Sequence, residues 1–349
     1  MSRFFSRKLD RLQVYVPGEQ PKIRDLIKLN TNESPFPPAP GVVEAAEKAA
    51  GTLRLYNDLS AAGLIEKLSE TYDLPPECIA VSNGSDEMLA FAFRAFGEKG
   101  AAFPDITYGF YPVWAELYGI DAKIIPLDED FRINIMDYAG CGRMAVIANP
   151  NAPTGIALTR DEIRFIVESN PDSVVIVDEA YVDFGAESAV SLIPDHDNLL
   201  VVQTFSKSRQ MAGARLGFAL GNAALIADLN RIRYSFHPYN VNSMTQAAGE
   251  AALLQKEYFE KCRREIMETR AWTAGQLRDL GFTVLDSKAN FLFAAPPDMA
   301  GAEYQKRLRE KNVVVRRFDL DRIKDYLRIT IGTREQMETL IALTKEMDL

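Results

Sequence analysis

The sequence has few of the residues that metal sites and disulfide frameworks need. Its 349 residues include two histidines, His196 and His237, and three cysteines, Cys78, Cys141 and Cys262. Two histidines give a histidine-based metal site or a Ser-His-Asp triad little to work with. An odd number of cysteines without metal-type spacing is typical of a reducing compartment. We therefore expect no metal centre, and cysteines that are buried or idle.

Long apolar runs and an excess of positive charge are also missing. No stretch approaches the ~18 apolar residues of a membrane span. The basic start, MSRFFSRKLDRLQVYVPG, has no apolar run after it, so we expect no secretory signal. The formal net charge is -9, which argues against nucleic acid or an anionic membrane as the main partner. We expect a cytoplasmic protein, and a local group of arginines could still bind a small anionic substrate.

The middle of the chain alternates short apolar runs with helix-like stretches. Runs such as VVIVD and LLVVQT are bounded by turn residues, and amphipathic stretches such as DEMLAFAFRAF lie between several of them. Strands that are apolar on both faces and alternate with helices indicate an α/β fold, with a mostly parallel sheet covered by helices on both faces. In such sheets, functional residues gather at the carboxyl ends of the strands.

The character of the chain changes near both ends, and its length favours two domains. Residues 1–40 are irregular, rich in Pro and Asn, and unable to form a core by themselves. After about residue 240 the chain is strongly helical and then contains the runs NFLFAA, NVVVRR and YLRITIG. We predict a large α/β domain over residues 46–245, a smaller α+β domain over 246–349, and a segment 1–45 that joins the smaller domain.

The most informative polar stretch is TFSKSRQMAGARLGF, which starts at Thr204. Lys207 follows an apolar run there and could reach into a cleft. A lysine that forms a Schiff base must be partly neutral, which requires burial or nearby positive charge. Arg215 could supply that charge and hold a phosphate with its planar fork. Taken alone, Lys207 fits a solvated surface lysine better than a catalytic one, so its neighbours in the chain have to decide.

An acidic residue, Asp178, ends the wholly apolar run SVVIVD. Burying a carboxylate is costly unless it has a positive partner. A protonated pyridine nitrogen is one such partner, and a loop cap or an ordinary ion pair is the alternative. Tyr181 follows three residues later and could donate its hydroxyl to an oxygen on the same ring.

Two further turns follow apolar runs. In VSNGSDEML, Gly84 and Ser85 precede a helical stretch with Asp86 in its first turn. Backbone amides at a helix start bind anions, although acidic residues there also suit simple capping. In NPNAPTG, residues 149–155, a fixed turn can aim an amide side chain at a ligand or merely connect two elements.

These four segments, in their order along the chain, resemble the fold-type I enzymes that depend on pyridoxal 5'-phosphate (PLP), the aspartate aminotransferase superfamily. Within it, the chain is most similar to the histidinol-phosphate aminotransferases. The resemblance runs nearly end to end, through LNTNESPFPP, VSNGSDEML, NPNAPTG, DEAY, TFSKS with AGARLGF, and LRITIGT. It implies the PLP-dependent transferase fold of type I, PLP as the cofactor, and a homodimer.

The resemblance implies a role for each residue around the cofactor. Lys207 would bind PLP as a Schiff base and then move protons, with Asp178 on the pyridine nitrogen and Tyr181 on the phenolic oxygen. Tyr108 would stack on the ring, and Tyr56 would reach the cofactor phosphate of the partner subunit. The remaining implied phosphate-binding residues are Gly84, Ser85, Asp86, Thr204, Ser206 and Arg215.

One position departs from the family pattern. Many relatives have Asn immediately before PTG, where its amide contacts the ring oxygen. Here that residue is Ala152, and Asn151 stands one position earlier. Either Asn151 makes the contact through a shifted loop, or Tyr181 makes it without help.

The substrate residues are also implied by resemblance. Arg328 matches an arginine that clamps the carboxylate of glutamate, a role that suits its two parallel donors. Arg316 matches an arginine associated with the phosphate of histidinol phosphate. Tyr15, Asn32 and Tyr239 resemble substrate-pocket residues, and each also fits a structural role.

The implied reaction belongs to histidine biosynthesis: L-histidinol phosphate and 2-oxoglutarate give imidazole-acetol phosphate and glutamate. An aromatic or broad-range aminotransferase would have the same cofactor residues. A threonine-phosphate decarboxylase of cobamide synthesis would also hold an amine next to a phosphate, but it breaks a different bond at Cα.

Overall fold

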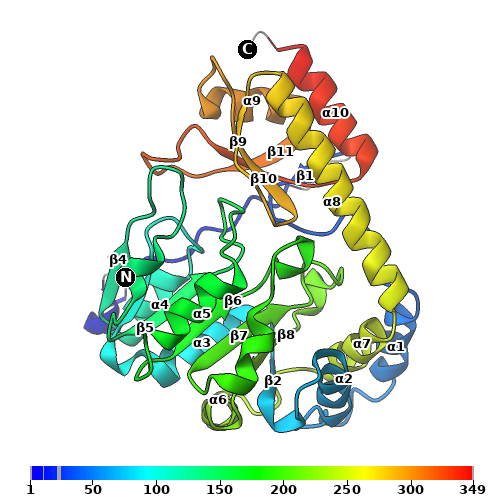
Figure 1. The fold of residues 1–349 in the computed structure, drawn as a ribbon. Coiled ribbons are helices and arrows are strands. Elements are labelled where there is room, and N and C mark those ends of the chain that lie inside the picture. Colours follow the sequence, from blue (N-terminus) through cyan, green and yellow to red (C-terminus); the bar gives the residue numbers. More distant parts are fainter. Residues whose placement is uncertain (1, 11, 22–24, 348–349) are drawn as a thin grey trace.

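The structure, a computed structural model, describes residues 2–10, 12–21 and 25–347. It contains two sheets, a seven-stranded one in the lower half of Figure 1 and a five-stranded one above it. Helices cover both faces of the larger sheet, which confirms the expected α/β class with a smaller α+β part. The exact domain boundaries stay a prediction.

The larger sheet is parallel except for one strand. Its order is β2-β8-β7-β6-β5-β3-β4, and only β8 runs antiparallel to its neighbours. The strands are β2 (Ile79–Ser82), β3 (Ala101–Pro104), β4 (Ala122–Ile125), β5 (Met144–Ala148), β6 (Val175–Asp178), β7 (Leu199–Thr204) and β8 (Gly217–Gly221). Since β5, β6 and β7 are parallel neighbours, the residues that follow them meet at one edge of the sheet.

Two apolar clusters, one on each face, bury this sheet. Every residue of β6 and β7 is buried, as expected for strands that consist mainly of Val, Ile and Leu. One face packs against α3 (Ser85–Phe96), α4 (Tyr111–Tyr118) and α6 (Ala223–Phe236). The other packs against α2 (Ala62–Tyr72), α5 (Arg160–Glu168) and α7 (Ser243–Leu253). The capping box of Thr159 and Glu162 fixes the start of α5.

The smaller sheet has the order β1-β11-β12-β10-β9. Its strands are β1 (Ile27–Leu29), β9 (Thr283–Val284), β10 (Phe291–Ala295), β11 (Val313–Arg317) and β12 (Leu327–Thr330). The remaining helices are α1 (Val42–Ala50), α8 (Lys256–Asp279), α9 (Gly301–Glu310) and α10 (Arg334–Lys345). The long helix α8 runs from beside α7 up to this sheet (Figure 1).

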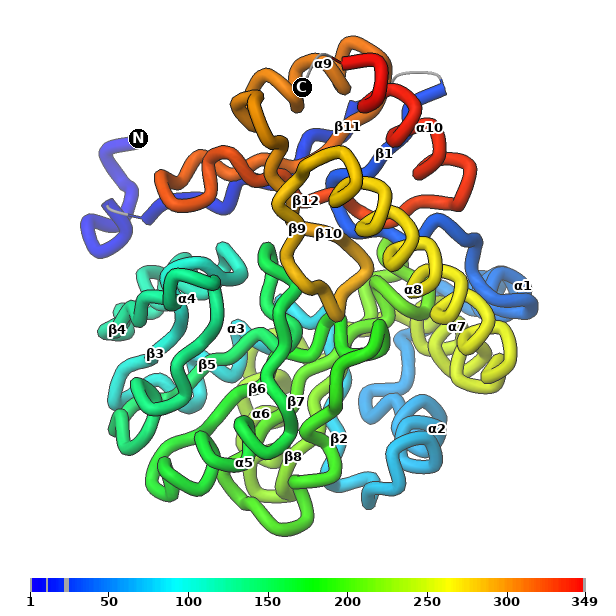
Figure 2. Tube along the Cα trace, turned by 45° about the horizontal axis from the view of Figure 1, so that its top comes forward, coloured from blue at the N-terminus to red at the C-terminus, as the bar shows by residue number. Residues whose placement is uncertain are grey.

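The expectation that residues 1–40 are irregular is wrong at β1. Ile27 pairs with Val313 in a parallel ladder, so the blue N-terminal segment lies beside β11 in Figure 2. Leu29 is buried in the core of the smaller sheet. Three residues are too few to show a strand pattern, and their partner strand lies almost 290 positions later.

Short 3-10 helices complete the chain: Arg7–Leu9, Pro76–Cys78, Gly97–Lys99, Ile135–Tyr138, Val182–Phe184, Ala189–Asp195 and Ala212–Ala214. In the part of the chain that the structure describes, no helix is both long and apolar enough to cross a membrane.

Candidate active site

The carboxyl ends of β6 and β7 open into a cavity of about 200 Å³ that the N-terminal segment and the smaller sheet also line. This cavity brings together most of the residues predicted from the sequence. Those that line it are Tyr15, Asn32, Ser85, Asp86, Tyr108, Asp178, Tyr181, Thr204, Ser206, Lys207, Arg215, Arg316 and Arg328.

Asp178 is the last residue of β6, and its side chain is buried. The hydroxyl of Tyr111 donates to its Oδ2 atom at 2.8 Å, and the backbone N–H of Ala180 donates to Oδ1 at 3.2 Å. Burial raises the pKa of Asp178 to about 6, although the hydrogen bond from Tyr111 acts to lower it. A cation in the cavity would therefore find a carboxylate that gains from pairing with it.

Lys207 follows β7 and points its amine into the same cavity. Its Nζ donates to the carbonyl oxygen of Thr31 at 3.3 Å and lies 5.8 Å from the centre of the Tyr181 ring. Burial is the main cause that lowers the pKa of Lys207 to about 8, and the positive charge of Arg328 contributes to this shift. An amine with such a pKa is partly neutral near neutral pH, which a nucleophilic lysine requires.

The predicted phosphate-binding residues lie together at the start of α3. Arg215 donates from Nη1 to Ser206 Oγ at 3.4 Å and from Nη2 to Asp86 Oδ2 at 3.1 Å. Gly84 has a φ of +80°, and a Cβ atom there would overlap the guanidinium of Arg215. Glycine at this position therefore lets the guanidinium of Arg215 lie close to the backbone at the start of α3. Thr204 completes the group, because its hydroxyl donates to Ser206 Oγ at 3.0 Å.

An aromatic group forms one wall of the cavity. The hydroxyl of Tyr108 donates to Asp86 Oδ1 at 2.6 Å, which fixes the ring beside the start of α3. Tyr15 comes from the N-terminal segment, and its ring stacks on Phe110 with centroids 4.2 Å apart. The segment is thereby fastened over the site.

Two arginines of the smaller sheet also line the cavity. Arg316 on β11 and Arg328 on β12 are register partners in an antiparallel ladder. Arg316 donates to the carbonyls of Val16 and Pro17 at 2.8 and 3.1 Å. The buried Nε of Arg328 has no hydrogen-bond partner within the described residues. Two guanidinium groups side by side, one of them incompletely paired, fit an anionic ligand.

Asn151 does not line the cavity. Its Nδ2 donates to the Ile106 carbonyl and to Thr154 Oγ1, both at 3.0 Å, and its Oδ1 accepts from Thr107 at 2.9 Å. Ala152 lines the cavity instead and offers no polar side-chain atom. Of the two alternatives for the ring-oxygen contact, this geometry favours Tyr181 acting without Asn151.

Tyr56 and Tyr239 also lie outside the cavity of their own chain. Tyr56 is 82% exposed, and its ring stacks on Tyr239 with centroids 4.6 Å apart. The structure shows no contact of either tyrosine with the cavity of its own chain. The predicted roles of Tyr56 and Tyr239 therefore stay predictions.

Several residues around the site had no signal in the sequence. Tyr111 stands 67 positions from Asp178 and reads as an ordinary core aromatic. Thr330 and Asn290 are buried hydrogen-bonding partners of Asn32. Thr31 acts through a backbone carbonyl, which every residue has. None of these contacts follows from a local pattern.

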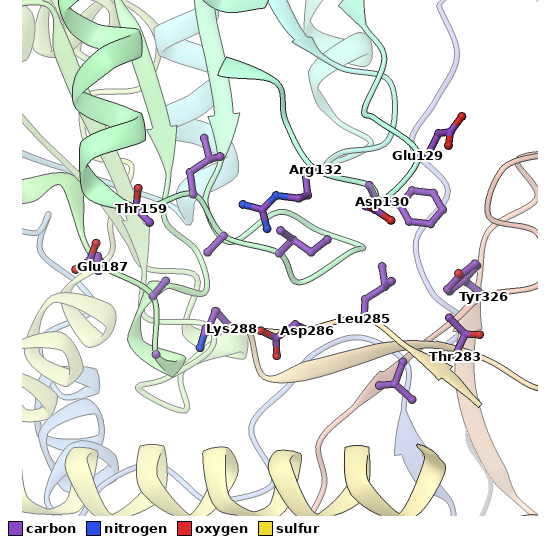
Figure 3. Close-up of a pocket in the computed structure, with 17 residues that line it drawn as sticks. Glu129, Asp130, Arg132, Thr159, Glu187, Thr283, Leu285, Asp286, Lys288 and Tyr326 are labelled. Carbon is purple, nitrogen blue, oxygen red and sulfur yellow. The ribbon is translucent and has the colours of Figure 1, made fainter. Parts of the chain in front are cut away.

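A larger cavity of about 630 Å³ lies elsewhere, between the β9–β10 turn and loops of the larger sheet (Figure 3). Arg132, Glu187, Asp286 and Lys288 are among its lining residues. None of the predicted site residues lines it. Its size alone therefore does not make it the candidate active site.

The comparisons define the class of protein. A model of the family "Aminotransferase class I and II" matches residues 24–343. The chain belongs to this family of PLP-dependent enzymes, which have the fold-type I architecture described above.

Individual relatives narrow the class. The chain is 49% identical over 353 residues to histidinol-phosphate aminotransferase 1 of Bordetella parapertussis, with 99% of both chains covered. It is 46% identical over 350 residues to histidinol-phosphate aminotransferase of Clostridium botulinum, again with 99% of both covered. A crystal structure of histidinol-phosphate aminotransferase from Sinorhizobium meliloti in complex with PLP has the same fold, with a TM-score of 0.86 at 22% identity, covering 98% of this chain and 96% of that one.

The residues present fit PLP. The cofactor has a phosphate, a basic ring nitrogen and an aldehyde, and the cavity offers a helix start, a buried carboxylate and a lysine with a lowered pKa. The glycine at position 84 leaves room for the guanidinium of Arg215, which places a positive group at the start of a helix, where a phosphate can bind.

Proposed function

We propose that this aminotransferase transfers the amino group of L-histidinol phosphate to 2-oxoglutarate, giving imidazole-acetol phosphate and glutamate. The names of the relatives support this substrate pair. The observation that carries it in the structure is the register pairing of Arg316 with Arg328 in the cavity of Lys207. One amino donor carries a phosphate and the acceptor carries carboxylates, and two adjacent guanidinium groups suit both.

When bound, PLP supplies an aldehyde that condenses with amines and a ring that withdraws electrons from the carbon bearing the amine. We assign Asp178 to the ring nitrogen, where its negative charge keeps that nitrogen protonated. Tyr181 donates its hydroxyl proton to the phenolic oxygen. Arg215 and Ser206 bind the phosphate together with the amides at the start of α3.

Lys207 holds the cofactor and then acts on the substrate. With the cofactor bound, its Nζ would accept the proton from the substrate Cα as a general base and later return it as a general acid. This exchange requires an amine that is partly neutral, and the pKa of about 8 meets that requirement.

Arg328 and Arg316 orient the substrate. We assign Arg328 to the carboxylate of glutamate and 2-oxoglutarate, and Arg316 to the phosphate of the amino donor. Arg316 also holds the backbone of Val16 and Pro17. An anion that binds Arg316 therefore contacts the same side chain that holds the N-terminal segment over the site.

The active form in this proposal is a homodimer. Tyr56 is exposed and stacked on Tyr239, so both rings are free to meet a second subunit. We propose that Tyr56 contacts the cofactor phosphate of the partner.

A steady-state comparison of histidinol phosphate, phenylalanine and threonine phosphate tests the substrate. We expect the highest kcat/KM with histidinol phosphate and amino transfer to 2-oxoglutarate. Equal kcat/KM for phenylalanine would indicate a broad-range aminotransferase. Release of CO2 from threonine phosphate would indicate the decarboxylase.

A further inference from the structure

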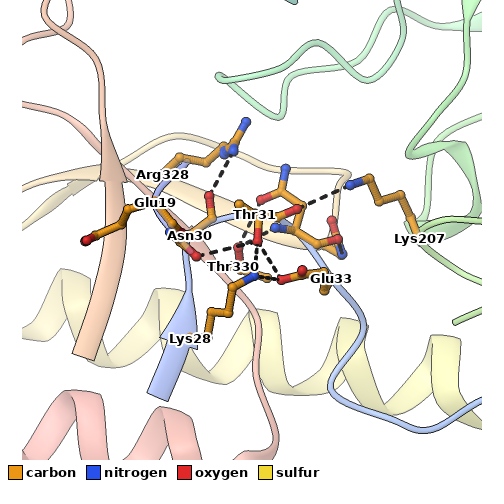
Figure 4. A network of polar contacts seen from close by, with 10 residues as sticks. Glu19, Lys28, Asn30, Thr31, Glu33, Lys207, Arg328 and Thr330 are labelled. Carbon is orange, nitrogen blue, oxygen red and sulfur yellow. Dashed lines mark hydrogen bonds and ion pairs between the residues drawn. The ribbon is translucent and has the colours of Figure 1, made fainter. Parts of the chain in front are cut away.

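Three consecutive residues of the N-terminal segment each contact a different residue of the site. The contacts join Arg328 Nη2 to the Asn30 carbonyl at 3.2 Å, Lys207 Nζ to the Thr31 carbonyl at 3.3 Å, and Asn32 Nδ2 to the Tyr181 hydroxyl at 2.9 Å. Figure 4 shows the first two. Those two use backbone carbonyls, which any residue provides. Of these three residues of the segment, only Asn32 makes its contact through its own side chain.

Thr330 fixes which end of the Asn32 amide faces Tyr181. The hydroxyl oxygen of Thr330 accepts from the backbone N–H of Asn32 at 3.0 Å, and its own proton goes to Asn32 Oδ1, also at 3.0 Å. A backbone N–H can only donate, so Thr330 keeps its hydroxyl proton available for Oδ1. The NH2 group of Asn32 is thereby directed at Tyr181.

The backbone of Asn32 is held as firmly as its side chain. Its φ is +57°, a left-handed conformation that Asn adopts more readily than most residues. Asn290, which is fully buried, donates from Nδ2 to the Asn32 carbonyl at 3.0 Å. Asn32 and Thr330 are themselves 1% and 2% exposed. The amide is therefore preorganised without any ligand.

This arrangement leaves the proton of Tyr181 for the cavity. An amide NH2 only donates, so the Tyr181 oxygen accepts from it, and the phenolic proton needs another acceptor. Within the described part of the chain, Asn32 is the hydrogen-bonding partner of that hydroxyl. The bond from Asn32 acts to lower the pKa of Tyr181, against the burial that raises it. Among the described residues that line the cavity, Asn32 alone has an amide side chain, since position 152 is alanine.

We propose that Asn32, held by Thr330 and Asn290, is a positioning residue for Tyr181. It directs the hydroxyl of Tyr181 to donate a hydrogen bond to the phenolic oxygen of bound PLP. The inference rests on the proposed role of Tyr181. It gives Asn32 a function other than the direct substrate contact expected from the sequence.

The test is the pH at which the absorbance of the bound cofactor changes in the resting holoenzyme. A hydrogen bond donated by Tyr181 stabilises negative charge on the ring oxygen of the cofactor. Without this hydrogen bond, the bound cofactor keeps its own proton up to a higher pH. For Asn32→Ala we expect an upward shift of about 0.5 to 1 pH unit, the size of one neutral hydrogen bond. Thr330→Val should shift the transition in the same direction, and Tyr181→Phe should shift it further.

The double variant Asn32→Ala/Tyr181→Phe separates positioning from a general structural effect. If Asn32 acts through Tyr181, the double variant has the same transition as Tyr181→Phe, because interacting residues are not additive. Additive shifts, or no shift in both Asn32→Ala and Thr330→Val, would overturn the inference. Ser34→Ala, on the same segment but outside the cavity, is the control and should behave as wild type.

The outcomes also separate this inference from the proposed function. If Tyr181→Phe leaves the transition unchanged, the role of Tyr181 is wrong and that of Asn32 falls with it. Failure of the proposed substrate assignment appears instead in the comparison of amino donors. That comparison does not depend on the absorbance of the resting holoenzyme.

Discussion

The amine of Lys207 donates a hydrogen bond to the carbonyl oxygen of Thr31, 176 positions earlier in the chain, at 3.3 Å. The lysine that follows a strand of the larger sheet is thus held by the segment that begins with β1 in the smaller sheet. The contact places the amine in a buried cavity beside Arg328, and both surroundings lower its pKa.

Protein without cofactor should react with PLP at a rate that follows the neutral form of Lys207. Because the pKa is about 8, the rate should rise with pH and level off about one unit above that value. Replacing Arg328 with Gln removes a positive charge that lowers the pKa, so the midpoint should move to higher pH. Stopped-flow absorbance measures this rate. A rate in the wild type that still rises tenfold per pH unit above about pH 9 would contradict a lowered pKa.

Binding of PLP should weaken in acid through Asp178. Its pKa is raised to about 6, so below that pH the carboxyl is protonated and loses its attraction for the ring nitrogen. Tyr111→Phe removes a bond that lowers this pKa, and the loss of affinity should then begin at higher pH. Asp178→Asn should weaken binding at least about 10-fold at neutral pH, the size of a charged hydrogen bond. Fluorescence titration measures the Kd, and the exposed Asp195→Asn is the control.

The two arginines of the cavity should affect different substrates. Arg328→Lys loses the parallel pair of donors and should raise the KM for 2-oxoglutarate by roughly 10- to 100-fold. Arg316→Ala should raise the KM for histidinol phosphate more than that for 2-oxoglutarate. Arg317→Ala is the matched control, because Arg317 is the next residue on β11 and pairs with Asp319 outside the cavity. Equal effects of the Arg316 and Arg328 variants on both substrates would refute the division of roles.

A mixture of two inactive variants should regain activity if Tyr56 serves the partner subunit. Lys207→Ala lacks the lysine, and Tyr56→Ala lacks the tyrosine that each subunit gives to the other. In a mixed dimer one site has both residues, so random mixing should restore about a quarter of the wild-type sites. Activity is measured after subunit exchange, with sedimentation to establish the dimer. No gain over the separate variants would show that Tyr56 acts within its own chain or not at all.

The sequence alone predicts that residues at the ends of parallel strands lie together at one edge of the sheet. Asp178 ends one apolar run and Lys207 follows another, and the order of parallel strands brings such residues to one sheet edge. Gly84 was recognisable because a glycine between a strand and a helix is a local pattern.

Residues whose role depends on distant pairing could not be predicted. The position of Thr31 follows from the pairing of β1 with β11, and a backbone carbonyl has no sequence signature. Asn32, Asn290 and Thr330 come from three separate segments that meet only in the folded chain. Asn151 is the opposite case, a residue that the sequence suggests but the structure does not bring to the cavity. Its amide hydrogen-bonds to neighbouring groups instead.

Mass spectrometry of the borohydride-reduced holoenzyme tests the cofactor assignment. Reduction makes the bond between PLP and its lysine permanent, and digestion then identifies the modified peptide. We predict that PLP is found on Lys207, and that Lys207→Ala carries none and has no measurable transamination. Finding PLP on another lysine of the wild type, or full turnover in Lys207→Ala, would contradict the account.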